Sequence, residues 1–280
     1  MNFFCHVPPK PDPGQEAEWR KILAPYYREF GIDAESIPTG PGRAPFSHEA
    51  ADVLSEFKPP VVSFHFGLPA PDLLTRVQAW HPLILSSATT VQEARWLEAN
   101  GAGAIIAQGF EAGGHRGHFL SHDLSEQIGT FALVPQVRRA VNVPVIAAGG
   151  IACARGVAAA LALGATAVQI GTAYLLCHES TTSSVHRAAI KSEARHHTAL
   201  TNLFSGGAAR GIMNRVMRNL GPMSNVPPPF PLAAAAMALL RAKAESRGSG
   251  DFSPLWSGQN ADGCKEMPAA QLTKELANAF

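Results

Sequence analysis

The stretch VPVIAAGGI, residues 143–151, decides how this chain folds. It opens with a continuous apolar run that ends at Gly149-Gly150, and a helix is expected soon afterwards, over residues 153–163. The next apolar run, residues 167–170, ends at Gly171-Thr172. Runs that are continuous rather than alternating are typical of strands buried on both faces of a parallel sheet. The order strand, helix, strand therefore predicts a βαβ unit.

The same pattern extends toward the N-terminus, with helices expected over residues 90–100 and 133–141. A dinucleotide-binding unit is disfavoured because no GxGxxG follows a strand, and neither a Walker A loop nor a GxSxG turn occurs. Polar and glycine residues collect where the runs end, which is where a barrel places its active site. We predict an α/β fold, a TIM-like (β/α) barrel that is incomplete, because six strands are recognisable and a closed barrel needs about eight. The further runs are Asn2-Phe3-Phe4 and residues 61–66, 83–85 and 104–107.

Two long segments lie outside this pattern. Residues 8–60 form an excursion between the first two strands, and the character of the chain changes again after residue 175. We therefore predict a barrel portion over residues 1–175 and an appended helical region over residues 176–280 that packs on the barrel. Within the second part, helices are expected over residues 178–199, 208–219, 232–246 and 268–279.

Composition disfavours several classes of function. The 280 residues carry 23 Lys and Arg against 22 Asp and Glu, so a net charge of +1 gives no general footprint for nucleic acid or an anionic membrane. The longest apolar run, residues 232–240, is far shorter than the roughly 20 residues that a membrane helix needs. The four cysteines form no CxxC pair, and no signal peptide is recognisable. We expect a protein of the reducing cytoplasm.

A histidine-containing loop follows the run at residues 104–107. It reads QGFEAGGHRGH over residues 108–118, and a loop after a strand of this kind lies at the catalytic face of a barrel. Gly113 and Gly114 let the backbone approach a flat ligand, and His115 is suited to abstract a proton near neutral pH. The alternative is a solvated surface turn. A metal site built on His118 and its neighbours is disfavoured because the histidine spacing matches no standard ligand pair.

The two glycine-ended runs predict an anion site. Successive βα loops with backbone amides and a helix N-terminus bind anions, and in barrels the loops after the last two strands commonly hold phosphate. Gly149, Gly150 and Gly171 would let the amides reach a phosphate, and Thr172 would add a hydroxyl. The alternative is that these glycines only form tight turns.

Taken in order, EAGGHRG, VPVIAAGGIA and AVQIGTAYL resemble motifs of the nitronate monooxygenase family, which consists of FMN-dependent TIM barrels. NFFCHVPP, FSGGAARG and LWSGQNA add to the resemblance, which spans nearly the whole chain. The resemblance implies FMN as the cofactor and His115 as the base that takes the α-proton of a nitroalkane. It also implies a cofactor-binding set of Asn2, Gln108, Gly114, Gly149, Gly150, Gln169, Ile170, Gly171 and Thr172.

The sequence departs from the family pattern in two places. The family begins with two further βα units, which carry a QAPM-like strand end and a GGLG-like turn, and neither occurs here. The chain therefore reads as a truncated or shortened member, and an unclosed barrel would expose two parallel edges. Gly206-Gly207 stands where the family pattern has Gly-Arg, which removes a cationic contact.

Three functions follow from these observations. The leading one is oxidation of alkyl nitronates or nitroalkanes by O2 to a carbonyl compound and nitrite, with these small molecules as the only partners expected. The second keeps FMN but reduces a quinone or an enoyl thioester with NAD(P)H. The third is an inactive barrel that retains only a phosphate pocket.

Overall fold

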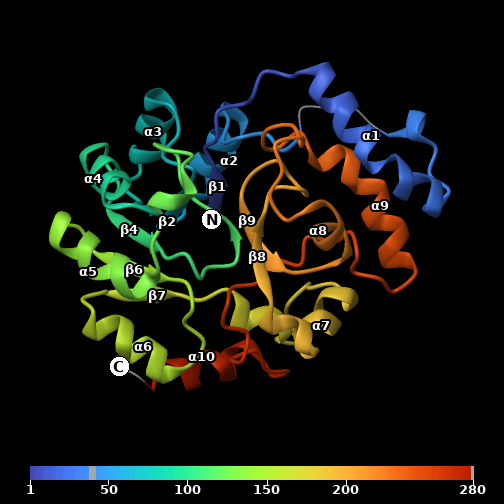
Figure 1. Ribbon diagram of the computed structural model, residues 1–280. Coiled ribbons are helices and arrows are strands. Elements are labelled where there is room, and N and C mark those ends of the chain that lie inside the picture. The colour runs from blue at the N-terminus through green and yellow to red at the C-terminus, as the bar shows by residue number, and fades with distance from the viewer. Residues whose placement is uncertain (38–41, 279–280) are drawn as a thin grey trace.

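The computed structural model describes residues 1–37 and 42–278, and a six-stranded parallel sheet forms the first half of the molecule (Figure 1). The strand order is β1-β2-β3-β4-β6-β7, so neighbours in the sheet follow the chain. All six expected strands are confirmed, and each carries the apolar run that predicted it. Their bounds are β1 Asn2–Phe4, β2 Val61–His65, β3 Leu83–Ala88, β4 Ala104–Gln108, β6 Val145–Ala148 and β7 Ala167–Gln169.

Helices between these strands cover the outer face of the sheet. Thr90 caps α4 through its side chain, which accepts a hydrogen bond from the Glu93 amide and thereby satisfies one of the free amides that begin the helix. Leu97 of α4 and Leu133 of α5 are fully buried against Ile105 and Val145 of the sheet. The helices are α2 His48–Phe57, α3 Pro71–Gln78, α4 Val91–Ala99, α5 Thr130–Ala140 and α6 Ala154–Ala162.

The sheet is a barrel that hydrogen bonds leave open. β1 and β7 stand at the two ends of the strand order, and within the described residues no strand pairing joins them. This confirms the prediction of an incomplete TIM-like barrel. Among the residues that the structure describes, no helix is both long and apolar enough to cross a membrane.

The region after residue 175 corrects two predictions. A helix over residues 178–199 is wrong in part, because α7 Ser184–Lys191 and a short 3-10 turn lead into the strand β8 Thr198–Thr201. A helix over residues 208–219 is also wrong in part, because the strand β9 Ala209–Ile212 precedes α8 Arg215–Leu220. The two strands join β5 Gly114–His115 in an antiparallel sheet of order β5-β9-β8. These residues form strands because they pair with the histidine loop, which is distant in sequence. The local periodicity of the sequence contains no information about such a partner.

The first part of the excursion over residues 8–60, which contains helix α1, packs against the last third of the chain. α1 Pro13–Phe30 lies beside α9 Ala234–Ser246, as the blue and red helices show (Figure 1). Trp19 and Leu240 are buried in their shared core, and the Tyr27 hydroxyl donates a hydrogen bond of 2.8 Å to the Ala236 carbonyl. α10 Ala269–Ala277 contacts α6 at the other side. The end of the expected helix at residue 279 lies outside the described residues, and the domain division at residue 175 stays a prediction.

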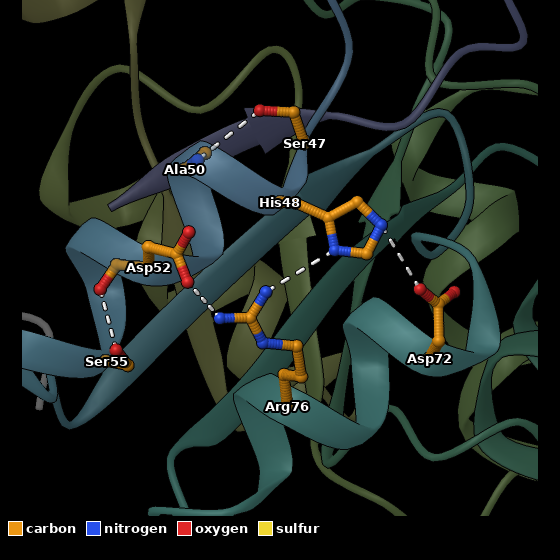
Figure 2. Close-up of polar contacts among 7 residues, drawn as sticks. All are labelled: Ser47, His48, Ala50, Asp52, Ser55, Asp72 and Arg76. Atoms are coloured by element: carbon orange, nitrogen blue, oxygen red, sulfur yellow. Dashed lines mark hydrogen bonds and ion pairs between the residues drawn. The ribbon is translucent and has the colours of Figure 1, made fainter.

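A polar network at the surface joins α2 to α3 (Figure 2). Arg76 forms an ion pair with Asp52, and its guanidinium lies 3.4 Å from Nδ1 of His48. Nε2 of the same histidine is 3.5 Å from the Asp72 carboxylate. Exposed pairs of this kind contribute about 0–1 kcal/mol each. The network therefore joins two neighbouring helices on the outer face of the sheet at little gain in stability.

Candidate functional site

A cavity of about 800 Å³ runs along the inside of the parallel sheet, from the amino ends of β1 and β2 to the turns after β4, β6 and β7, and we call it the inner cavity. Loops after β4, β6 and β7 form its wall, together with the segment at residues 256–260. All ten residues of the predicted site line it, although their chemical roles stay predictions. These residues are Asn2, Gln108, Gly114, His115, Gly149, Gly150, Gln169, Ile170, Gly171 and Thr172.

The loop after β4 is held by two buried side chains. Gln108 donates through Nε2 to the His115 carbonyl (2.9 Å) and accepts through Oε1 from the Gly117 amide (2.7 Å). Arg116 is 0% exposed and donates to the carbonyls of Gln108 and Gly109 and to the Gln127 side chain. Burial lowers the pKa of Arg116 to about 10, so the guanidinium keeps its charge at neutral pH. These contacts fix the backbone on both sides of His115.

His65 supports the same loop from β2. Its Nε2 lies 3.2 Å from the His115 carbonyl, and its Nδ1 lies 3.1 Å from the Ser87 hydroxyl. A carbonyl only accepts, so Nε2 carries the proton and Nδ1 accepts from Ser87. Burial, as the largest cause, lowers the pKa of His65 to about 4. The neutral ring is therefore a positioning group beneath the loop.

The His115 ring lies among aromatic groups. Its Nε2 is 2.8 Å from the Ser205 hydroxyl, and its ring centroid is 5.0 Å from that of Phe230 and 5.5 Å from that of Trp256. Burial, followed by the charges of His65 and Arg43 among others, lowers the pKa of His115 to about 3. The imidazole is therefore neutral at neutral pH, and its protonated form is disfavoured in this surrounding.

The opposite end of the inner cavity is built from backbone. Gly149 and Gly150 have φ angles of +118° and +72°, which favour glycine. Helix α6 begins just beyond them without a side-chain cap on its first amides. A Cβ at Gly171 would meet no protein atom within 4 Å, so this residue faces open space. The Thr172 hydroxyl accepts from the Gly258 amide at 2.9 Å and keeps its own proton to donate.

These features suit a phosphate-bearing ligand. Free amides at a helix N-terminus and glycine backbone attract anions, and the cavity volume falls within the range of about 300–1,000 Å³ that holds drug-sized ligands. Polar side chains elsewhere on the wall suit hydrogen bonding to a heterocycle. The arrangement therefore fits a nucleotide with its phosphate at the α6 end and its ring toward the histidine loop.

Several lining residues were missed by the sequence reasoning. Trp256 and Asn260 lie in the LWSGQNA motif, which carried the resemblance but was assigned no role; Asn260 donates to the Gly150 carbonyl at 2.9 Å. His65 lies near the end of the predicted run at residues 61–66 and is the last residue of β2, and that position is the signal that was available for it. Arg43 is brought in by the excursion and lies over the Phe4 ring at 4.2 Å, a contact that nothing local in sequence indicates.

Metal ligation finds no support around the histidine loop. Nδ1 of His118 is 2.8 Å from the Ser121 carbonyl, and its ring packs edge-on against His122. Among the described residues, no group of three His, Cys, Asp or Glu is arranged to hold a metal ion.

We compared the chain with known protein families, sequences and structures. The family model for nitronate monooxygenase matches residues 2–279. A nitronate monooxygenase of Pseudomonas aeruginosa is 41% identical over 99% of this chain and 79% of its own length, and one of Paraburkholderia phytofirmans is 39% identical over 99% and 76%. A crystal structure of nitroalkane oxidase from Streptomyces ansochromogenes is similar with a TM-score of 0.88 at 37% identity, covering 99% of this chain and 80% of that one. FabK from Thermotoga maritima has a TM-score of 0.64 at 32% identity, covering 85% and 73%.

Proposed function

The chain belongs to the nitronate monooxygenase family of oxidoreductases, and we propose that it oxidises alkyl nitronates and nitroalkanes with O2 to a carbonyl compound and nitrite. The observation that carries the proposal is the convergence of His115 and the three glycine-containing turns around one cavity of about 800 Å³. We also assign the protein to the cytoplasm, because its four free cysteines suit a reducing compartment.

FMN is the cofactor we assign to the inner cavity. The backbone of Gly149 and Gly150 would hold its phosphate, with Gly171 leaving room and Thr172 donating a hydroxyl hydrogen bond. Gln108 and Asn2 would lie toward the flavin ring. Bound flavin supplies the electron acceptor between the nitronate and O2. The protein supplies position and electrostatics, which these turns provide through backbone rather than through charged side chains.

His115 is the base in this proposal. It accepts the α-proton of a neutral nitroalkane, because burial holds its imidazole neutral. The same burial makes the protonated ring unfavourable, so the nitronate anion formed in the step must stay beside it to offset the cost. A substrate that arrives as a nitronate has already lost this proton. We therefore assign His115 a large role for nitroalkanes and a small one for nitronates.

The test is direct. The purified chain is mixed with FMN, titrated by flavin fluorescence, and assayed for O2 uptake and nitrite release with propyl nitronate and 1-nitropropane. We expect a yellow protein that releases nitrite from both. Lack of flavin binding, or binding without nitrite release, would contradict the proposal. Anaerobic mixing with NADH addresses the reductase alternative, because rapid bleaching of the flavin would favour it.

A further inference from the structure

A second cavity, of about 840 Å³, lies on the other side of the wall that carries His115, and we call it the outer cavity. Among the residues that the structure describes, no Asp, Glu, Lys or Arg lines it. Its entrance carries apolar side chains that are exposed to solvent: Val7 is 86% exposed, Met223 44% and Trp96 38%. The lining also includes the histidines His6, His118 and His122 and the asparagines Asn202 and Asn225. Exposed apolar groups around a cavity that lacks acidic, lysine and arginine side chains are typical of a binding site for a mostly apolar ligand.

The partition between the two cavities is one layer of rings. Phe230 lines the outer cavity, and its centroid is 5.0 Å from that of His115, which lines the inner one. Phe66 stands beside it at 5.3 Å and has a φ of +67°, a strained backbone angle for a phenylalanine. Strain of this kind persists where the surrounding structure imposes it, often at ligand sites.

Glycines bring this partition close to the base. Ser205, which contacts Nε2 of His115, is followed directly by Gly206 and Gly207 in the outer wall. A Cβ at Gly206 would lie 2.1 Å from the Pro228 carbonyl oxygen, and one at Gly207 would lie 3.1 Å from Cβ of Phe230. Glycine at both positions therefore lets the Phe230 segment pack directly on the turn that contacts His115.

We propose that the outer cavity binds the apolar chain or ring of the substrate, so that the substrates are nitro compounds and nitronates with a tail of about six carbons or more. This inference rests on the proposed function and assigns its substrate class. The reacting carbon lies at His115 in the inner cavity, and the tail passes the Phe230 side of the partition into the outer cavity. A short nitroalkane would leave most of about 840 Å³ unfilled. Each buried methylene strengthens binding by up to about fourfold.

The experiment compares two nitronates on the FMN-loaded enzyme, one from 1-nitropropane and one from 1-nitrooctane. We expect kcat/KM to be at least tenfold higher for the octyl compound. Met223→Glu places a charge at the apolar entrance and should remove this preference while propyl turnover stays within threefold. Ala208→Phe fills the outer cavity and should act in the same direction. Phe131→Glu is the matched control, because Phe131 is an exposed residue of α5 outside both cavities.

A calorimetric titration of the protein with 1-nitrooctane, without turnover, separates this inference from the proposed function. If 1-nitrooctane binds with a negative heat-capacity change, and Met223→Glu abolishes this binding, the inference is supported. A lack of nitrite release in the assay would then contradict the proposed function alone. Nitrite release from both nitronates with equal kcat/KM supports the function and overturns the inference. Competition between NADH and 1-nitrooctane would also overturn it, because the outer cavity would then hold a nicotinamide cofactor.

Discussion

The two cavities on either side of His115 differ in how they are made. The inner cavity takes its binding groups from turns that directly follow β4, β6 and β7, and each turn is a short continuous motif. The outer cavity takes single residues from many segments, among them residues 5–9, residues 202–208 and residues 223–230. The inner cavity is lined by many glycines and by Arg43. The outer cavity, among the described residues, is lined by no Asp, Glu, Lys or Arg, but by apolar side chains together with three histidines and two asparagines.

The difference teaches that the two kinds of recognition leave different traces in a sequence. A phosphate is bound by backbone amides of glycine-containing turns, and each such turn leaves a short local motif in the sequence. An apolar tail is bound by area, which any nearby segment contributes. The inner cavity is therefore suited to what a family shares, and the outer cavity is free to differ between members.

The largest effect is expected from removing the proposed base between the two cavities. His115→Ala should lower kcat/KM for 1-nitropropane by about 10²–10⁴-fold, the usual contribution of general base catalysis. Turnover of propyl nitronate should fall by less than tenfold. The measurement is the rate of nitrite release with both substrates. An equal decrease in kcat/KM for the two substrates would show that His115 does not act as a base.

The wall of the outer cavity depends on one buried carboxylate. Glu93 is 1% exposed and accepts hydrogen bonds from the Thr89 amide and hydroxyl and from the Phe119 amide. Glu93→Ala leaves these donors buried without partners, so the free energy of unfolding should fall by about 3 kcal/mol. Urea denaturation measures it, with Glu56→Ala on the exposed face of α2 as the control. A loss below about 0.5 kcal/mol would contradict this role.

A larger side chain at the proposed phosphate site of the inner cavity should weaken FMN binding without affecting the outer cavity. Gly171 has an ordinary φ of −110° and open space beyond its Cα, so Gly171→Val should fold normally while obstructing the ligand. We expect FMN affinity to fall at least tenfold, with a melting temperature unchanged in the absence of FMN. Ala238→Val on α9 adds similar bulk elsewhere and should leave FMN affinity unchanged. Unaltered FMN binding in Gly171→Val would exclude Gly171 from the cofactor site.

The smallest effect expected is on stability in acid. The pKa values of His65 and His115 are lowered to about 4 and about 3 in the folded protein, mainly by burial. The unfolded chain therefore binds protons first, from about pH 6.5 downward, and the stabilisation present above that pH is lost as the pH falls toward 4. Urea midpoints at pH 7, 5.5 and 4.5 should decrease in that order. In His65→Gln the urea midpoint should depend less steeply on pH. If the dependence on pH is the same as in the unmodified protein, other groups cause the effect.

Much of the parallel sheet was predictable. The run before Gly149 has no polar alternation, and the strand β6 that it forms is largely buried, as such a run predicts. The turns that follow were also identified correctly as lining one cavity. The antiparallel pairing of β9 with the histidine loop was not predictable, because residues 208–219 satisfy a helical pattern locally and only a partner strand distant in sequence decides otherwise.

The sequence by itself determined the parallel strands, the positions of their glycine-ended turns and the presence of a histidine in one of them, because strand burial and tight turns are local consequences of residue type. The tertiary structure alone decided that His115 contacts Ser205, that Phe230 stands against it, and that the outer cavity opens behind both. Those contacts join residues about 90 positions or more apart, and their geometry is set by the packing of whole segments.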